Sequence, residues 1–121
     1  MSRNSISPNQ ELRFGEYIQS LNDEYYTIMQ ADSNLVTYRR GHGPVWATGT
    51  ANFCAQRLVL QSDGNLVMFD SDKRVIWETG TKVEPFSSRM RLTITNQGFL
   101  LLDNDGDTIW SSADTNKDQT K

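Results

Sequence analysis

The most constraining feature of this chain is a segment of about 31 residues that occurs three times. Residues 58–69 repeat the pattern of residues 27–38 at an offset of 31, and residues 92–103 repeat it after a further 34 residues. A Trp with similar neighbours follows each copy. Internal periods of this size indicate structural units that bury their apolar faces against one another. We therefore divide one 121-residue domain into units at about 16–50, 51–82 and 83–115, followed by a polar tail at 116–121.

Each unit has the sequence pattern of β-strands. Runs rich in Val, Ile, Leu, Tyr and Phe alternate with Asp-Gly and similar turn signals, and no stretch keeps a helical apolar period for three turns. A three-residue loop between Gln61 and Asn65 sets these two residues opposite each other and segregates the apolar residues on the other face. Such a loop ends in a residue of positive φ, a position that suits Gly64 and Gly98 but suits Ser33 less. The predicted core positions are Leu58, Leu60, Leu66 and Met68, with Leu92, Ile94, Leu100 and Leu102 in the third unit.

Three similar sheets, none able to bury its apolar face alone, predict an all-β fold around a pseudo-threefold axis. Trp46, Trp77 and Trp110 are the natural fillers of its centre, because one occurs in every unit. Residues 1–15 are expected only to lead into the first sheet.

Polar side chains recur at alternate positions on the outer face of the first two units. Each set holds an amide, a carboxylate, a second amide, a small apolar residue and an aromatic residue. Amides and carboxylates can bond adjacent hydroxyls of a pyranose ring while valine covers its C–H surface. Folding alone does not require these residues, so the pattern predicts two sugar sites. Site 1 comprises Gln30, Asp32, Asn34, Val36 and Tyr38, and site 2 comprises Gln61, Asp63, Asn65, Val67 and Phe69.

The spacing Gln-x-Asp-x-Asn-x-Val-x-Tyr over residues 30–38 resembles the signature of the monocot bulb-type, snowdrop-agglutinin-like mannose-specific lectins, a family with fish and fungal members. The likeness extends over about residues 10–115. It implies a β-prism II fold of three four-stranded antiparallel sheets, calcium-independent mannose binding without a cofactor and, commonly, homodimers formed by exchange of C-terminal strands. High-mannose glycans as partners and a role in defence or agglutination are further implications.

The resemblance also assigns a role to each residue of site 1. Asp32 and Asn34 are expected to bond the axial 2-hydroxyl, Gln30 the 3-hydroxyl and Tyr38 the 4-hydroxyl, while Val36 packs on the ring carbons. The axial 2-hydroxyl distinguishes mannose from glucose. Loss of its partners is expected to cost about 1–3 kcal/mol, because buried polar groups are left unsatisfied.

Three departures from the family pattern change these expectations. Phe69 lacks the tyrosine hydroxyl, so site 2 is expected to be weaker by about 0.5–1.5 kcal/mol. Ser33 stands where plant members often have a disulfide-forming cysteine, which leaves Cys54 unpaired. The third copy has lost the carboxylate and amide pair, and no mannose binding is expected at site 3, which comprises Thr95, Gln97, Phe99, Leu101 and Asp103.

The main alternative is a β-prism that serves as a protein-interaction or structural module and has lost sugar binding. Catalysis is not expected, because Asp32 and Asp63 belong to different sheets and no motif sets a nucleophile beside His42. The segment Asp103–Asp107 only superficially resembles a calcium loop, since Thr108 stands at the position of its invariant glycine. A hairpin turn is the better interpretation, and no metal site is predicted.

Charge and cysteine content limit the remaining classes of partner. The net charge is −3 and no run of Lys and Arg exceeds two residues, so nucleic acid is not an expected partner. No apolar run approaches the roughly 20 residues of a membrane helix, so membrane insertion is not expected. The first residues lack the apolar segment of a secretory signal and Cys54 is the only cysteine. Together these features predict a cytoplasmic protein or one exported without a leader.

Overall fold

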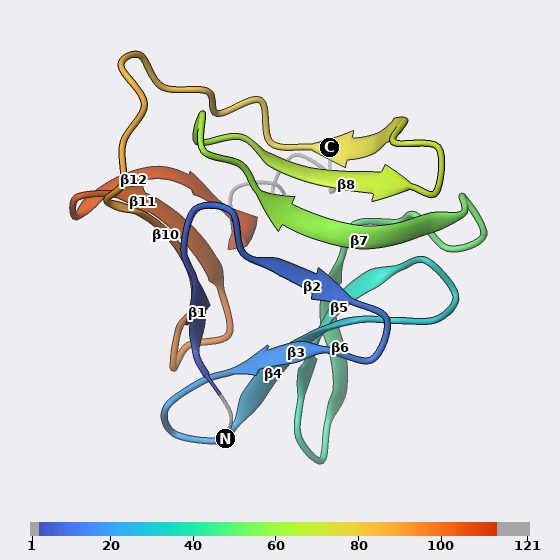
Figure 1. Ribbon diagram of the computed structural model, residues 1–121. Coiled ribbons are helices and arrows are strands. Elements are labelled where there is room, and N and C mark those ends of the chain that lie inside the picture. The colour runs from blue at the N-terminus through green and yellow to red at the C-terminus, as the bar shows by residue number, and fades with distance from the viewer. Residues whose placement is uncertain (1–2, 114–121) are drawn as a thin grey trace.

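Three four-stranded antiparallel sheets make up the part of the chain, residues 3–113, that this computed structural model describes. Figure 1 shows them arranged like the sides of a triangular prism. Sheet 1 contains β3 (Tyr17–Gln19), β4 (Tyr25–Met29), β5 (Leu35–Arg39) and β6 (Gly43–Ala47). Sheet 2 contains β2 (Glu11–Arg13), β7 (Ala55–Leu60), β8 (Leu66–Asp70) and β9 (Val75–Glu78). Sheet 3 contains β1 (Ser5–Ile6), β10 (Met90–Ile94), β11 (Leu100–Asn104) and β12 (Asp107–Ser111).

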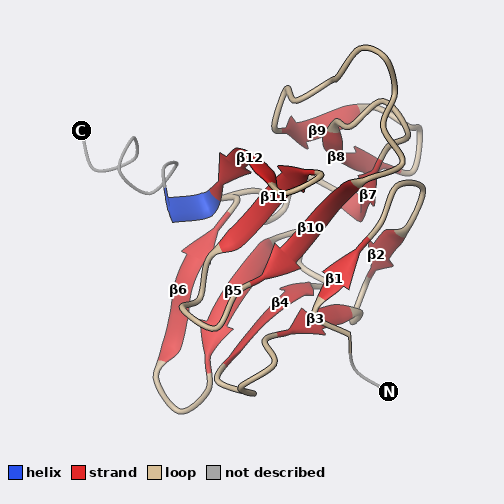
Figure 2. Ribbon diagram, turned by 90° about the vertical axis from the view of Figure 1, so that its left-hand side faces the viewer, coloured by secondary structure: helices blue, strands red, loops and turns tan. Residues whose placement is uncertain are grey.

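The strand pattern confirms the predicted all-β fold with one sheet for each repeat. Helical backbone within the described residues is confined to residues 112 and 113 (Figure 2). Strand β12 pairs with β11 of the same chain, so sheet 3 is complete without a strand from a second copy. The tail at 116–121 lies outside the described residues.

The N-terminal segment does more than the sequence predicted. Residues 1–15 were expected to lead into the first sheet, but they supply an edge strand to each of the other two sheets, since β1 pairs with β10 and β2 with β7. Strand β3 then begins sheet 1 by pairing with β4. All three strands have only two or three residues, which is too short for an alternating pattern to be recognised. The segment therefore ties the three sheets together along one side of the prism (Figure 1).

The three hairpins have the predicted three-residue loop. In the second unit the Gln61 amide donates to the Asn65 carbonyl at 2.9 Å, and the Gly64 amide donates to the Gln61 carbonyl at 3.0 Å. The residue that ends each loop has positive φ, which is +88° at Gly64, +91° at Gly98 and +79° at Ser33. Ser33 thus adopts the left-handed conformation, although this position was expected to suit it less than glycine.

The inner faces of the sheets form one apolar core, as the parity of the strands predicted. All eight predicted core positions in units two and three are at most 1% exposed. Unit one differs, because its equivalents of Leu58 and Met68 are Thr27 and Thr37, both completely buried. Their hydroxyl oxygens lie 2.7 Å apart across the β4–β5 pair. Each hydroxyl therefore satisfies the other inside the core.

This threonine pair leads to a stability prediction. Thr37→Val is expected to lower the free energy of unfolding by about 1–3 kcal/mol, because it leaves the Thr27 hydroxyl buried without a partner. The double replacement Thr27→Val, Thr37→Val removes both polar groups and is expected to recover most of that loss. Urea unfolding of the single and double variants measures the difference. Equal stability of the single variant and the unaltered protein would contradict the assignment.

The three Trp side chains meet where the last strands of the sheets converge. Their ring centroids lie 5.8–6.2 Å apart with interplanar angles of 71–76°, so each ring edge faces a neighbouring ring. Trp46 is 5% exposed and belongs to the core. Trp77 and Trp110 are partly buried and pack against the core, so one side of this cluster reaches the surface.

Candidate functional site

The five residues of site 1 lie together on the outer face of sheet 1, around the β4–β5 hairpin. Gln30 follows β4, Asp32 lies in the loop, Asn34 precedes β5, and Val36 and Tyr38 belong to β5. Alternation along β5 turns Asn34, Val36 and Tyr38 to the same face, away from the core. Val36 is on the outer face but is only 4% exposed. The arrangement is a shallow apolar floor with polar groups around it.

Asp32 and Asn34 both take part in holding the hairpin. Asp32 Oδ1 accepts a hydrogen bond from the Asn34 backbone amide at 3.0 Å. Asn34 Oδ1 accepts from the Thr48 hydroxyl, the Gly49 amide and the Thr50 amide, each at 3.1 Å. The expectation that folding does not require these residues is therefore wrong for both, because each supplies one oxygen to the local backbone.

The three donors around Asn34 Oδ1 also fix the orientation of its side-chain amide, since the Nδ2 group cannot accept hydrogen bonds. Within residues 3–113, Asn34 Nδ2 donates no hydrogen bond and Asp32 Oδ2 accepts none. The loop thus presents one amide donor and one carboxylate acceptor to a ligand.

An aromatic cluster supports the other end of site 1. The Gln30 amide donates to the Tyr38 hydroxyl. Tyr38 stacks on its cross-strand partner Tyr26 with centroids 5.2 Å apart, and the Arg40 guanidinium lies 4.6 Å from the Tyr26 centroid. Neither Tyr26 nor Arg40 was predicted as part of the site, although the register of the predicted hairpin sets residue 26 opposite residue 38. These contacts restrict the Tyr38 ring before any ligand arrives.

Site 2 repeats the backbone anchors of site 1 on sheet 2. Asp63 Oδ1 accepts from the Asn65 amide at 2.9 Å. Asn65 Oδ1 accepts from the Thr79 hydroxyl at 3.3 Å, the Gly80 amide at 2.9 Å and the Thr81 amide at 3.2 Å. The amide of Asn65 therefore has the same orientation as that of Asn34.

Three contacts distinguish site 2 from site 1. The amide group of Asn65 donates to Glu78 Oε1 at 2.9 Å, and the Lys82 ammonium lies 4.0 Å from Asp63 Oδ2. Phe69 offers no hydroxyl to Gln61. The position of Tyr26 in site 1 is taken by Arg57, whose guanidinium lies 5.4 Å from the Phe69 centroid. Asn65 and Asp63 are therefore more fully engaged with the protein than their equivalents in site 1, whereas Gln61 lacks the bond that Gln30 makes.

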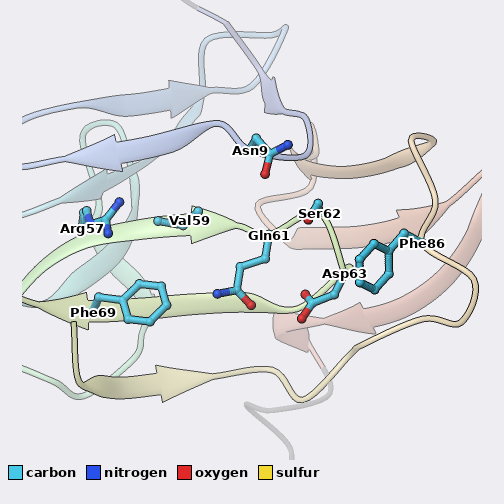
Figure 3. Close-up of a pocket in the computed structure, with 8 residues that line it drawn as sticks. All are labelled: Asn9, Arg57, Val59, Gln61, Ser62, Asp63, Phe69 and Phe86. Carbon is cyan, nitrogen blue, oxygen red and sulfur yellow. The ribbon is translucent and has the colours of Figure 1, made fainter.

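A cavity of about 400 Å³ opens over site 2. Figure 3 shows the Gln61 side chain between those of Phe69 and Asp63, with Phe86 on the far side of Asp63. Phe86 comes from the long connection between β9 and β10 and is 64% exposed. The lining residues are Asn9, Arg57, Val59, Gln61, Ser62, Asp63, Phe69 and Phe86.

An ion pair fixes one wall of this cavity. Arg57 donates to Glu11 Oε2 at 3.0 Å, and Arg13 bonds the other oxygen of the same carboxylate. The hydrogen bond from Arg13 is the main cause that holds the pKa of Glu11 below its usual value; burial opposes it, and the hydrogen bond from Arg57 lowers the pKa further. Glu11 therefore stays ionised in neutral solution and keeps Arg57 above the Phe69 ring.

Site 3 has a different surface on sheet 3. Phe99 occupies the position of Asn34 and is 43% exposed, Leu101 is half-buried, and Gln97 is exposed in the loop. The Thr95 hydroxyl accepts from the Phe99 amide at 3.2 Å, and Asp103 occupies the position of Tyr38. No side-chain amide anchors the following loop here; the Leu100 amide donates to the Ser112 hydroxyl at 2.9 Å. The structure thus brings no carboxylate and amide pair together at site 3 in the described part of the chain.

The other residues singled out in the sequence form no further site within residues 3–113. Asp103–Asp107 spans the β11–β12 hairpin turn, where Asp105 Oδ1 pairs with Arg89 at 3.3 Å. His42 lies in the exposed β5–β6 turn, and Cys54 is a free, exposed cysteine. Asp32 and Asp63 belong to separate sheets. Over residues 3–113 no cluster of three or more metal-binding side chains is found, and no helix there has the length and apolarity needed to span a membrane.

Proteins of known structure or function are similar to this chain in sequence and fold. No family model matches the chain. The B-type lectin plumieribetin of Scorpaena plumieri is 40% identical over 114 residues, which cover 94% of this chain and 97% of that protein. Monomeric monocot mannose-binding lectins from Gastrodia elata match with a TM-score of 0.78 and 30% identity, over 90% of this chain and 96% of theirs. The mannose-specific agglutinin from snowdrop (Galanthus nivalis) bulbs, solved with methyl-α-D-mannoside, matches with a TM-score of 0.72 and 27% identity, over 88% of this chain and 93% of its own.

Proposed function

This chain belongs to the B-type lectin family and has the β-prism II fold, and on that premise we propose that it is a calcium-independent mannose-binding lectin. Site 1 is the principal site, site 2 is weaker, and site 3 does not bind. The observation that carries the proposal is the fixed amide of Asn34, which leaves a donor in the same loop as the second carboxylate oxygen of Asp32. A donor and an acceptor that are ordered before binding suit a sugar hydroxyl, because little entropy is lost when it binds.

The remaining groups of site 1 suit the rest of a mannose ring. In the proposed mode Asn34 and Asp32 bond the axial 2-hydroxyl, Gln30 the 3-hydroxyl and Tyr38 the 4-hydroxyl, while Val36 contacts the ring carbons. Glucose has an equatorial 2-hydroxyl, which would leave the Asn34 donor and the Asp32 acceptor without a partner. That mismatch is expected to cost about 1–3 kcal/mol and to make the site selective for mannose.

Several sites are needed for useful avidity. A shallow site that binds one monosaccharide is expected to have a dissociation constant of about 1 mM, equivalent to about −4 kcal/mol. Sites 1 and 2 lie on different sheets of one chain, and a homodimer would double their number. Simultaneous contacts with a branched high-mannose glycan can raise avidity by about 10²–10⁴. We therefore propose recognition of mannose-rich surfaces, with agglutination or defence as the biological use.

Titration with methyl α-mannoside in buffer containing EDTA, followed by amide NMR, tests this function. The amides of Gly49 and Thr50 report on site 1, and those of Gly80 and Thr81 report on site 2, because they bond the two site asparagines. We expect the site 1 signals to move at about millimolar mannoside and the site 2 signals at higher concentrations. Glucose and galactose are the controls. If no signal moves at tens of millimolar, the chain is a protein-interaction module instead; movement only after addition of calcium contradicts calcium independence.

Removal of the Tyr38 hydroxyl group tests the role of Tyr38 in mannoside binding. Tyr38→Phe removes the hydroxyl that bonds Gln30 and gives site 1 the aromatic ring found in site 2. We expect mannoside affinity at site 1 to fall about 3- to 10-fold, the effect of one hydrogen bond, with little change in stability. Tyr26→Phe is the matched control, since it keeps the stacked ring and alters no proposed sugar contact. An equal loss of affinity in both variants would show that the Tyr38 hydroxyl has no direct role.

A further inference from the structure

Sites 1 and 2 differ at the residue that faces the floor valine from the neighbouring strand. In sheet 1 the cross-strand partner of Val36 is Ala47, at the end of β6. In sheet 2 the partner of Val67 is Glu78, at the end of β9. These positions are equivalent in the two repeats, so the same location carries a methyl group beside one site and a carboxylate beside the other.

The Glu78 carboxylate engages one of the two N–H donors on the Asn65 side-chain amide. Asn65 Oδ1 is fully used by the loop of residues 79–81, as Asn34 Oδ1 is by residues 48–50. Only the Nδ2 group can therefore serve a ligand. In site 2 Nδ2 donates to Glu78 Oε1 at 2.9 Å, whereas the Ala47 methyl group in site 1 offers no acceptor.

We propose that Glu78 weakens site 2 for mannose by holding the Asn65 amide in an internal hydrogen bond. The inference rests on the proposed function and adds a specificity-determining residue to it. A 2-hydroxyl that approaches Asn65 must compete for this N–H with a charged acceptor already in place, and hydrogen bonds to charged groups are the stronger kind. The absence of a hydroxyl on Phe69 is then only part of the difference between the two sites.

Reciprocal exchange of the two equivalent residues tests the proposal on the full chain. The probe is methyl α-mannoside, read at the amides of Gly80 and Thr81 for site 2 and of Gly49 and Thr50 for site 1. Glu78→Ala is expected to tighten site 2 about 3- to 10-fold and to leave site 1 unchanged. Ala47→Glu is expected to weaken site 1 by a similar factor and to leave site 2 unchanged.

A third variant separates the hydrogen bond from the charge. Glu78→Gln keeps an acceptor oxygen at the same position, so site 2 is expected to stay weak. A gain in Glu78→Gln equal to that in Glu78→Ala would overturn the proposal, because charge alone would then account for the effect. The proposal also fails if Glu78→Ala leaves site 2 unchanged or weakens it, the latter being the result if Glu78 itself contacts the sugar.

Mannoside titration of the unaltered protein distinguishes failure of the Glu78 proposal from failure of the proposed lectin function. If mannoside moves no site 1 signal in the unaltered chain, the proposed lectin function itself fails. If site 1 binds normally but does not weaken in Ala47→Glu, only the inference about Glu78 fails. Thermal unfolding identifies any variant that has lost the fold. If either Glu78→Ala or Ala47→Glu is unfolded, the other variant still tests the proposal.

Discussion

Asn34→Asp is expected to abolish mannoside binding at site 1 while the protein stays folded. The variant keeps an oxygen where the Thr48 hydroxyl and the amides of Gly49 and Thr50 donate, so the loop retains its anchor. It replaces the Nδ2 donor by a second carboxylate oxygen close to Asp32, so a sugar hydroxyl loses its donor and meets two anionic groups. We expect an affinity loss of more than about tenfold, since a charged group is left without a partner.

Asn34→Ala is the informative comparison, because it removes both functions of the side chain. It deprives three donors of their acceptor and is expected to lower the free energy of unfolding by about 1–3 kcal/mol, in addition to abolishing binding. Mannoside titration and urea unfolding of the two variants separate the effects. If Asn34→Asp retains its affinity for mannoside, the Nδ2 group does not contact the sugar. If Asn34→Asp loses as much stability as Asn34→Ala, the side-chain oxygen of Asn34 does not anchor the loop.

Because this asparagine also holds the hairpin, its presence in the motif does not by itself indicate sugar binding. Nine of the ten residues of sites 1 and 2 match the motif, which favoured sugar binding at both sites. The structure assigns backbone contacts to Asp63 and Asn65, so these two residues would be needed for the hairpin even without a ligand. Gln61 and Val67 are better indicators of binding, because the hairpin does not use their side chains in this way.

The hairpins of the fold could be predicted because their strands have five or six residues with a clear inner and outer face. The same alternation gave the loop length, the positive φ at Gly64 and the outer-face motif. The edge strands β1 and β2 could not be predicted, since a pattern of two or three residues has no measurable period. Glu78 was missed for another reason: it lies outside the motif, and only the β8–β9 register brings it beside Asn65.

Gly98→Ala is expected to cause a large loss of stability that reveals how sheets 1 and 3 are joined. A Cβ atom at Gly98 would lie 2.5–2.9 Å from three atoms of the Tyr25 ring, at the start of β4. The adjacent junction is fixed by Asn22, which donates its backbone amide to Asn96 Oδ1 at 3.0 Å and its side-chain amide to the Asn96 carbonyl at 3.1 Å. The ring also packs against the core, so it cannot move away without disturbing other contacts.

Gly106→Ala is the matched control for backbone strain. Its φ of +93° is almost equal to the +91° of Gly98, but a Cβ atom there meets nothing within 4 Å. Gly106→Ala is expected to lower the free energy of unfolding by about 1–2 kcal/mol, the cost of a left-handed alanine. Gly98→Ala is expected to lower it by about 2–5 kcal/mol, because overpacking adds to that cost.

The difference between the two glycine variants isolates the contact with Tyr25. In a Tyr25→Ala background the ring is gone, so the cost of Gly98→Ala is expected to fall to that of Gly106→Ala. Urea unfolding of the four combinations of Gly98→Ala and Tyr25→Ala measures this coupling. Additive losses would mean that the ring moves aside freely, and the junction of sheets 1 and 3 would then depend on the Asn22 and Asn96 hydrogen bonds instead of on close packing.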